Sequence, residues 1–538
     1  MTARSFADLA LVGARIRTLD PDRPVATAVA MRAGTIVAVG SDAEVRAACD
    51  GGTETIDLGG AALVPGLTDS HIHPFLGSDG ALGADLTGVT TLEGVVDALR
   101  AERARCGDGD WVRGYALAYE AFPDGGIDGR LIEEAVGGNP ALISFFDFHT
   151  ALATPEALRR AGVDGPRTFS EAAEVVCADG APTGELRESG AISLVLEATP
   201  EPTDEERLQR YRTTFERINA VGITGCHVMV GSPQLYEVCR ELDARGWMTA
   251  RCIVPLHQEP DISDDEVAAR LPLLGERGRM WRGGTAKFFI DGVVETGTAW
   301  LYQPDTNGGG TVPFWPTEER YASVVGRFAR AGFACTTHAV GDRAVRAALD
   351  AYRTAGPVAG RMHRIEHIET LQDHDLPRFA AEHVSASMQP LHMENNQADQ
   401  SDPWSRALGP ERSGRAFRTR DIWDSGALVC LGSDWPVARF DPRLGMAWCR
   451  LRREPGHPER GSYGPAQVLT GLETLLGYTR NPAALAGESA LSGCIREGYR
   501  ADLTGFAHDP VDVDADDLLE LPVTLCVVDG VVRHRVDV

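Results

Sequence analysis

The chain has 538 residues, more than one small hydrophobic core can organise, so we expect a large domain with accessory structure. Its formal net charge is −26, from 52 Lys and Arg against 78 Asp and Glu, which excludes an electrostatic basis for nucleic-acid binding. With no signal-peptide pattern, no run of about 18 apolar residues and eleven scattered cysteines, we expect a cytoplasmic protein that does not span a membrane.

Short strands separated by turns are predicted at both ends of the chain. Near the beginning they cover residues 9–12, 28–31 and 35–40, with Gly34 at a hairpin turn. Near the end they cover residues 501–506, 523–528 and 531–532, and Asp529-Gly530 between the last two is typical of a hairpin. We therefore predict that residues 1–65 and 490–538 form one small β-sandwich domain.

Strands and helices alternate through residues 66–489. The predicted strands are residues 63–70, 221–230, 248–256, 286–290, 333–337, 362–368, 384–389 and 428–432, with helical patterns at 234–245, 318–331, 343–354 and 376–382. Eight strands, most followed by a helix, predict an α/β fold of the (β/α)₈ TIM-like barrel type. The long interval between the first two strands contains the strand-like residues 141–146, so we predict an inserted α/β subdomain at about 80–205.

Lys287 is the only lysine among the 52 Lys and Arg residues. It lies in the apolar fourth strand, where burial can remove the proton of a lysine and make the amine a nucleophile, whereas an arginine stays protonated. The alternative is that an arginine-rich sequence kept one lysine by chance. The position of Lys287 within a predicted barrel strand favours a functional role.

Histidines and an aspartate follow the ends of other predicted strands. His71 and His73 alternate after the first strand, so both point to the same side, and His338, His367 and Asp434 end the fifth, sixth and eighth strands. A single histidine is more often a hydrogen-bonded core residue than a ligand. Carboxyl ends of barrel strands converge, however, and imidazoles with carboxylates suit a divalent ion such as zinc. We therefore predict a metal site at His71, His73, Lys287, His338, His367 and Asp434.

Several motifs resemble those of the amidohydrolase superfamily. Residues 65–74 (PGLTDSHIHP) resemble its first-strand signature. Residues 285–292 (TAKFFIDG), His338 with Gly341-Asp342, Gln389-Pro390, residues 432–436 (GSDWP) and 498–503 (GYRADL) are similar to its YtcJ-like branch, amidohydrolase family 3. The resemblance covers nearly the whole chain, and it implies an enzyme that hydrolyses carbon–nitrogen bonds other than peptide bonds.

The resemblance also implies a binuclear metal centre, with two divalent ions that we expect to be Zn²⁺. His71 and His73 would bind the more buried ion together with Asp434, and His338 and His367 would bind the second. Lys287 would carry a CO₂-derived carbamate that bridges the two ions. A metal-bridging hydroxide would then attack an amide, N-acyl or N-formyl bond of a small molecule, with Asp434 as the catalytic group that takes up its proton and passes it to the departing nitrogen.

Two alternatives use the same barrel: a mononuclear deaminase of a cyclic amidine, and a non-catalytic scaffold. We expect a small-molecule amide as the substrate and neither nucleic acid nor membrane as a partner, and we leave a homodimer open. Further residues that we expect near the substrate are His149 in the insertion, His227 at the end of the second strand, and the loop aromatics Trp300, Tyr302 and Trp435. For His149 a hydrogen bond within the subdomain is the alternative, and for His227 a place in the core.

Overall fold

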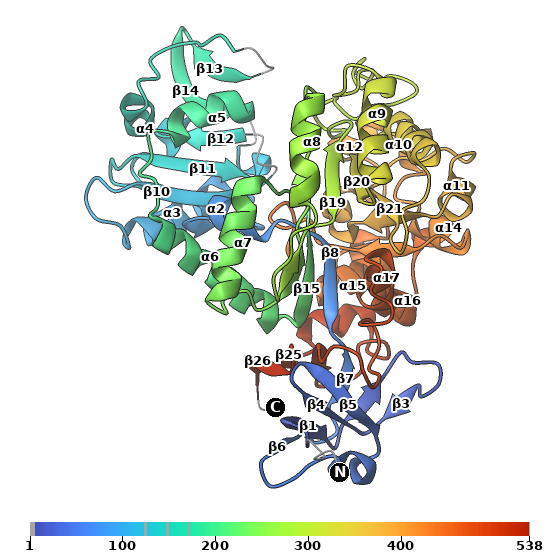
Figure 1. Cartoon of the computed structure of the whole chain (residues 1–538). Helices are drawn as coiled ribbons and strands as arrows, with labels where there is room; N and C mark the ends of the chain where they lie inside the picture. The colour runs from blue at the N-terminus through green and yellow to red at the C-terminus, as the bar shows by residue number, and fades with distance from the viewer. Residues whose placement is uncertain (1–5, 123–125, 147–149, 170–172, 537–538) are drawn as a thin grey trace. The chain divides into compact units, whose positions relative to one another are not determined.

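The computed structural model describes residues 6–122, 126–146, 150–169 and 173–536, and the chain forms two compact units (Figure 1). Unit 1 comprises Met1–His73, Arg212–Asp434 and Arg439–Val538. Unit 2 comprises Pro74–Tyr211 and Trp435–Ala438. Unit 2 is therefore an excursion of the chain that begins directly after His73.

Two sheets in unit 1 are built from the ends of the chain, and the second of them combines strands from both ends. One has the order β5 (Thr35–Gly40), β4 (Ala28–Arg32), β1 (Leu9–Val12), β6 (Glu54–Asp57), with α1 (Asp42–Arg46) beside it. The other has the order β26 (Val531–Arg535), β25 (Val523–Val528), β24 (Leu503–Phe506), β7 (Ala62–Pro65), β2 (Arg15–Arg17), β3 (Val25–Ala26). Figure 1 shows these blue and red strands side by side.

A shared apolar core holds these two sheets. Leu11 and Val29 of the first sheet and Leu525 and Val527 of the second belong to one cluster of buried side chains. Both predicted hairpins are confirmed, because β4 and β5, and β25 and β26, pair antiparallel around the predicted turns. At the second turn, Asp529 and Gly530 both have positive φ angles, 55° and 73°, as the tight hairpin turn requires.

The other strands of unit 1 form two parallel sheets. One has the order β18 (Trp281–Arg282), β16 (Arg251–Ile253), β15 (Ile223–Val228), β8 (Leu67–Ile72). The other has the order β17 (Leu256–His257), β19 (Thr285–Phe289), β20 (Ala334–Ala339), β21 (His363–His367), β22 (Val384–Met388), β23 (Val429–Leu431). The α/β fold class is thus confirmed.

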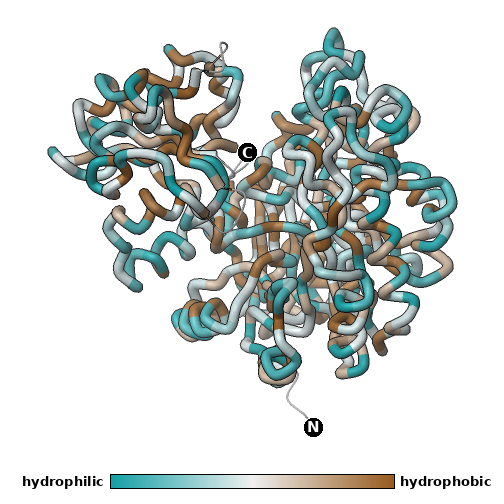
Figure 2. The backbone as a smooth tube through the Cα atoms, turned by 90° about the horizontal axis from the view of Figure 1, so that it is seen from above, coloured by the Kyte–Doolittle hydropathy of each residue, from teal (hydrophilic) through white to brown (hydrophobic). Residues whose placement is uncertain are grey.

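Helices follow most of these parallel strands. They are α7 (Pro233–Ala244), α8 (Asp264–Leu273), α9 (Glu318–Arg330), α10 (Asp342–Ala355), α11 (Leu376–Ala381), α12 (Pro403–Leu408), α13 (Pro410–Ser413), α14 (Thr419–Asp424), α15 (Pro442–Leu451), α16 (Gly471–Tyr478) and α17 (Arg480–Leu485). Short 3₁₀ turns are η3 (Pro390–Asn395), η4 (Pro458–Arg460), η5 (Pro465–Gln467) and η6 (Ala515–Glu520). In Figure 2 hydrophobic stretches lie inside unit 1 and hydrophilic turns lie outside. This is the distribution expected when amphipathic helices pack their apolar faces against the strands.

Two predicted strands are broken in the structure. The expected strand 63–70 divides at Gly66 into β7, which pairs with β24, and β8, which pairs with β15. A Cβ atom on Gly66 would lie 2.2 Å from Thr224 Oγ1, so only glycine fits this crossing between sheets. The expected strand 248–256 divides into β16 and β17, which pair with different neighbours. Pro255 lies at this break and has no N–H to continue a ladder.

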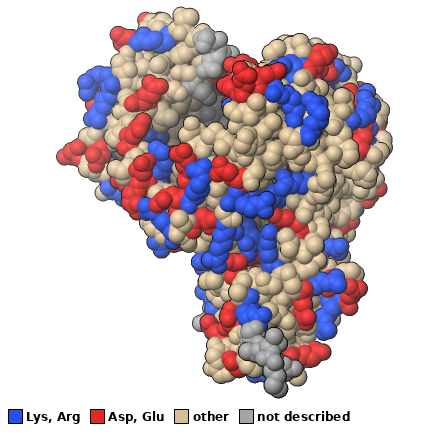
Figure 3. Space-filling view, viewed as in Figure 1, with Lys and Arg blue, Asp and Glu red and all other residues tan. Residues whose placement is uncertain are grey.

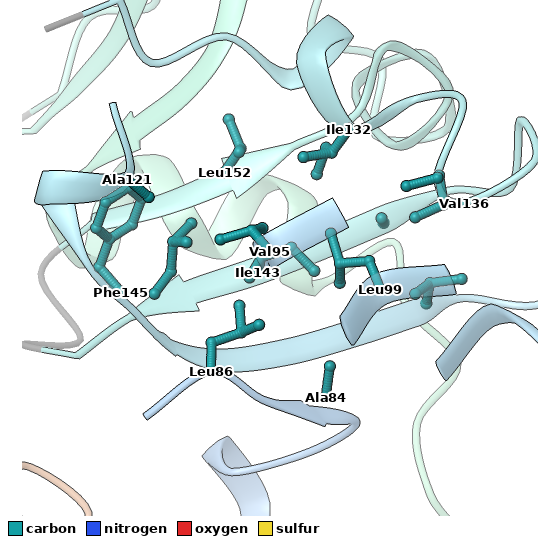
Figure 4. Packing of buried hydrophobic residues seen from close by; sticks show 14 of the residues in the cluster. Ala84, Leu86, Val95, Leu99, Ala121, Ile132, Val136, Ile143, Phe145 and Leu152 are labelled. Atoms are coloured by element: carbon teal, nitrogen blue, oxygen red, sulfur yellow. The ribbon is translucent and has the colours of Figure 1, made fainter. Parts of the chain in front are cut away.

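Unit 2 has one six-stranded sheet, in the order β13 (Glu174–Ala178), β14 (Ala181–Arg187), β12 (Thr150–Ala153), β11 (Ala141–Phe145), β10 (Val112–Leu117), β9 (Ala84–Asp85). Its helical segments are α2 (Pro74–Gly80), α3 (Leu92–Arg103), η1 (Tyr119–Ala121), η2 (Gly129–Ile132), α4 (Pro155–Arg160), α5 (Glu188–Leu196) and the first part of α6 (Asp204–Ala220). Val95 and Leu99 of α3 pack with Ile143 and Phe145 of β11 in one core (Figure 4). Across the described ranges, the helices are all too short or too polar to cross a membrane.

Candidate metal centre

Three residues of unit 1 bring ligand atoms to one point. His71 lies near the end of β8, His73 directly follows that strand, and Asp434 follows β23. His71 Nε2 is 3.1 Å and His73 Nε2 is 2.9 Å from the same oxygen, Asp434 Oδ1. All three side chains are buried. They form one group whose ligand atoms are close enough to share a metal ion.

The other oxygen of Asp434 faces a second group of imidazoles. His392 Nε2 is 3.2 Å and His367 Nδ1 is 3.9 Å from Asp434 Oδ2, and these three residues also form a group that could hold an ion. The rings of His338 and His367 are 4.3 Å apart, centre to centre. Asp434 therefore lies between two sets of imidazoles, one at each carboxylate oxygen.

Lys287 lies on β19, beside the strand that carries His338. Its side chain is fully buried, and its Nζ has no hydrogen-bond partner within the described part of the chain. The amine lies 4.7 Å from the centre of the Phe289 ring. Burial lowers the pKa of Lys287 from 10.5 to about 8, although the carboxylates of Glu366 and Asp434 oppose this shift. A minor part of this amine is thus neutral near neutral pH, and the neutral part grows as the pH rises past 8.

Glu366 orients the first imidazole. The Nδ1 of His71 lies 2.7 Å from Glu366 Oε2, so an N–H donated there leaves the lone pair of Nε2 free for a metal ion held beside Asp434. Burial alone would raise the pKa of Glu366, but Arg364, which is paired with it, and His71 hold that pKa well below its usual range. A permanently ionised carboxylate therefore fixes the ring of His71.

Two further buried carboxylates hold the loops that carry candidate ligands. Asp69 Oδ1 accepts the backbone N–H groups of His71 at 3.0 Å and Ser433 at 3.1 Å, which ties the end of β8 to the residue before Asp434. Asp291 accepts backbone N–H groups from the loop after His338, including that of Gly341 at 2.8 Å. Burial raises the pKa of Asp69 to about 6 and that of Asp291 to about 8.

Two of the candidate ligands have an uncommon backbone conformation. The φ angles of His367 and Asp434 are 74° and 61°, in the left-handed region that non-glycine residues rarely adopt. Such residues persist where the surrounding structure holds them, and they concentrate at functional sites. The turn at His367 also ends the regular alternation of β21, which lets the neighbouring Glu366 and His367 both contact the cluster.

The remaining imidazoles are kept neutral, with one exception. Burial lowers the pKa of His73 and lowers that of His338 to about 3, and nearby charged groups such as Lys287 contribute to both shifts. The pKa of His367 is also lowered well below its usual range, first by burial. For His392, burial is outweighed by contacts with Asp434 and Glu369, which raise its pKa to about 10. A metal ion requires neutral imidazole, so His392 would have to release a proton on binding one.

The donor set fits a divalent metal ion. His73 Nδ1, His367 Nδ1 and Lys287 Nζ are buried without a hydrogen-bond partner in the described residues, which is costly unless another group satisfies them. Imidazole nitrogens with carboxylate oxygens are the ligands that zinc and similar ions take. The residues whose ligand atoms could hold ions form two groups, His71, His73 and Asp434 in one and His367, His392 and Asp434 in the other. The ring of His338 lies beside that of His367, and Lys287 is buried nearby without a hydrogen-bond partner in the described residues.

The residues predicted near the substrate have varied positions. His227 Nδ1 lies 3.0 Å from Arg364 Nη1, one contact removed from Glu366. The rings of Trp300 and Tyr302 both stack on Arg343 of α10, and no contact with the histidine cluster is present among the described residues. Trp435 belongs to unit 2, where its ring lies against Gly77 of α2. His149 falls outside the described residues.

His392 and Glu366 were missed by sequence reasoning. His392 lies in η3 after β22, two residues beyond the Gln389-Pro390 motif, and it is not part of that motif. Glu366 is adjacent to His367 in the chain, and strict strand alternation would place the two on opposite faces. The available signal was chemical, because a carboxylate within a buried apolar strand requires a charged or hydrogen-bonding partner.

An α/β scaffold with a buried cluster of imidazoles and carboxylates near the carboxyl ends of parallel strands is typical of metal-dependent hydrolases. Residues 54–534 match the amidohydrolase family, so the chain belongs to this family, and the resemblance found in the sequence is confirmed. The protein is therefore a hydrolase that acts on carbon–nitrogen bonds.

Named relatives match over most of their length. YtcJ of Bacillus subtilis, which is named as an amidohydrolase, is 26% identical over 498 residues, 90% of this chain and 91% of that protein. N-substituted formamide deformylase of Arthrobacter pascens is 26% identical over 545 residues, 98% of each chain. A solved metal-dependent hydrolase from Pyrococcus horikoshii has a TM-score of 0.75 at 20% identity, with 94% of this chain and 99% of that chain covered. This last likeness shows a shared fold.

Proposed function

We propose that the chain is a binuclear metal-dependent amidohydrolase that cleaves an amide, N-acyl or N-formyl bond of a small molecule. We also propose that its two parallel sheets are parts of one (β/α)₈ barrel. Two backbone hydrogen bonds support closure: Asp434 N donates to His71 O at 2.7 Å, and His257 N donates to Gly231 O at 2.9 Å. Residues 1–65 and 490–538 would form the β-sandwich domain beside this barrel, and residues at about 80–205 the insertion.

The position of Asp434 carries the proposal. One carboxylate has imidazoles within 3.1 Å of Oδ1 and within 3.9 Å of Oδ2, so it can take part in two neighbouring ion sites. Lys287 supplies the one buried amine of the cluster. Its neutral form can add to CO₂ with release of one proton, and the resulting carbamate is an anion long enough to bridge two cations. An arginine at this position would stay protonated.

Bound divalent ions, which we expect to be zinc, would polarise the substrate carbonyl and make water a nucleophile near neutral pH. The protein supplies the rest. Asp434 accepts the proton of the attacking water and delivers it to the departing nitrogen, which would otherwise leave as a poor amide anion. Glu366 holds His71 in the tautomer whose Nε2 is free, and Asp69 holds the backbone of His71 and Ser433 so that Asp434 stays beside it.

The relatives support the substrate class. The named activity of the Arthrobacter pascens protein is removal of a formyl group from an N-substituted formamide, and it matches this chain along 98% of both lengths at 26% identity. At that identity the acyl group and the amine can both differ. Small-molecule amides therefore define the substrates to be tested. The eleven free cysteines are in keeping with a reducing, cytoplasmic location.

Metal analysis of protein purified without chelators tests the proposal first. Two transition-metal ions per chain, and loss of the second when the protein is reconstituted without CO₂, are the expected results. One ion that is insensitive to CO₂ would contradict the Lys287 carbamate and favour a mononuclear deaminase. Protein that takes up no ion even when metal is supplied would favour a non-catalytic scaffold.

A panel of N-formyl and N-acyl amines then tests the reaction. Release of the amine should require metal, and Asp434→Asn should reduce turnover by at least about a thousandfold, because the variant cannot transfer the proton. Asp512→Asn is the matched control, since Asp512 is an exposed carboxylate with a side chain 74% accessible. Near-native turnover in Asp434→Asn would remove Asp434 from the mechanism.

A further inference from the structure

A second polar cavity lies in unit 1, at the opposite ends of the parallel strands from the candidate metal centre. Its volume is about 470 Å³, and it is lined by the start of β8, by β15 as far as His227, by β16 and β18, and by the residues before β21. Residues after α17 complete its wall. None of the candidate metal ligands lines the cavity, so it is separate from the proposed catalytic site.

Arginines dominate the lining of this cavity. Six line it, and only two carboxylates, Glu488 and Asp502, do so among the described residues; the arginines are Arg251, Arg277, Arg279, Arg282, Arg361 and Arg500. The chain as a whole carries a net charge of −26, so a positively charged cavity is contrary to its average composition. In Figure 3 blue side chains gather around a hollow between the parallel strands and the small β-sheets.

The ion pairs within the cavity do not neutralise all of its arginines. Arg282 and Arg500 share the carboxylate of Glu488, at 2.9 Å and 2.6 Å. Arg251 is paired with Asp502 at 2.6 Å and with Asp529 at 2.8 Å, and Asp529 also pairs with Arg279. These pairs have a structural role, because they join the parallel strands to the carboxyl-terminal segment of the chain.

Arg277 and Arg361 are not neutralised in this way. Within the described ranges neither pairs with a carboxylate, and the side chain of Arg361 donates only to the backbone oxygen of Gly284, at 2.9 Å. A Cβ atom on Gly284 would lie 2.4 Å from Arg361 Nη1 and 3.3 Å from Arg282 Nη1, so the two guanidinium groups lie close together. Burial and the charges of Arg282 and Arg277 lower the pKa of Arg361, although the carboxylate of Glu488 opposes this shift. Like charges held together in a cavity are stabilised by an anion.

We propose that this cavity is a binding site for a small molecule that carries a phosphate group. Guanidinium groups bind phosphate through paired, charge-assisted hydrogen bonds, and two of them without carboxylate partners supply the charge that a phosphate dianion requires. Arg277 and Arg361 are the residues that contact the anion, with Arg282 beside them. A volume of about 470 Å³ exceeds what a free phosphate fills, so the ligand is a phosphate monoester. This site does not depend on the proposed hydrolysis.

Isothermal titration calorimetry on the metal-loaded full chain tests the proposal. The probes are inorganic phosphate, a pentose 5-phosphate and the unphosphorylated pentose. We expect one pentose 5-phosphate per chain, weaker binding of inorganic phosphate and none of the pentose. Loss of affinity with added salt should accompany both phosphate probes. Equal affinity for the two phosphate probes would identify free phosphate as the ligand and would refute the proposal of a phosphate monoester.

Three variants locate the binding. Arg277→Gln and Arg361→Gln should each weaken pentose 5-phosphate binding at least about tenfold, because each removes a charge-assisted contact. Arg277 is exposed and pairs with no carboxylate in the described ranges, so its replacement should leave the fold intact. Arg159→Gln, at an exposed ion pair of unit 2, is the matched control and should not change the affinity. Binding that persists in both cavity variants, as at a metal ion, would overturn the proposal, as would no binding of any probe.

Discussion

Replacing Lys287 with methionine should stabilise the metal-free protein at neutral pH. Burial lowers the pKa of Lys287 from 10.5 to about 8. At about 1.4 kcal/mol per tenfold change in proton affinity, the buried ammonium costs the folded state about 3 kcal/mol. The pH dependence of this cost follows from proton binding. Below pH 8 Lys287 is protonated in both the folded and the unfolded protein, so the full cost applies. Above pH 10.5 Lys287 is neutral in both, so the cost disappears. The methionine side chain would be uncharged throughout and could pack on Phe289.

Thermal unfolding of CO₂-depleted apoprotein between pH 6 and pH 10.5 measures this effect. With about 2.1 cal/mol/K of unfolding entropy per residue over the roughly 400 residues of unit 1, a gain of about 3 kcal/mol raises Tm by about 4 °C. The gain should shrink as the pH rises from 8 to 10.5. Lys287→Arg is the matched control, since arginine stays charged and its penalty should persist at every pH. A Lys287→Met variant that is no more stable at pH 7, or whose gain is independent of pH, would refute the lowered pKa.

Three further changes test other parts of the structure. Glu366→Gln removes the carboxylate 2.7 Å from His71 Nδ1 and should weaken metal binding about 10- to 100-fold in chelator competition; unchanged affinity would remove Glu366 from the orientation of His71. His392→Asn should destabilise the apoprotein below pH 6.5 and lose this effect as the pH rises towards 10, because a histidine with a raised pKa stabilises the folded state only while protonated; a pH-independent difference in Tm would contradict the pairing with Asp434. Leu99→Ala should cost unit 2 about 2–5 kcal/mol in urea unfolding, because Leu99 is fully buried, whereas the exposed Leu131→Ala should change little; equal effects would place Leu99 outside the core.

The parts of the fold that depend on local chemistry were predictable. Periodicity located the helices α7, α9, α10 and α11 to within about two residues, and Asp529-Gly530 specified a hairpin because few residue pairs tolerate two positive φ angles. The positions where strands break were less predictable from the sequence. Residues 63–70 were predicted as one strand. Only the crossing of Gly66 over Thr224 shows why the chain changes sheets there.

The sequence alone also indicated most of the chemical groups of the candidate site, apart from His392 and Glu366. Metal chemistry was indicated by a lone lysine in an apolar strand and by histidines and an aspartate at the ends of other strands. Both the type of each possible ligand and its position relative to a strand can be predicted from the sequence. Only the tertiary structure decided which groups meet. His392 comes to Asp434 from a 3₁₀ turn, and positive φ angles at His367 and Asp434 redirect side chains that regular strands would point elsewhere. Contacts between residues hundreds of positions apart, such as His71 with Glu366, depend on strand pairing and packing, which no local pattern specifies.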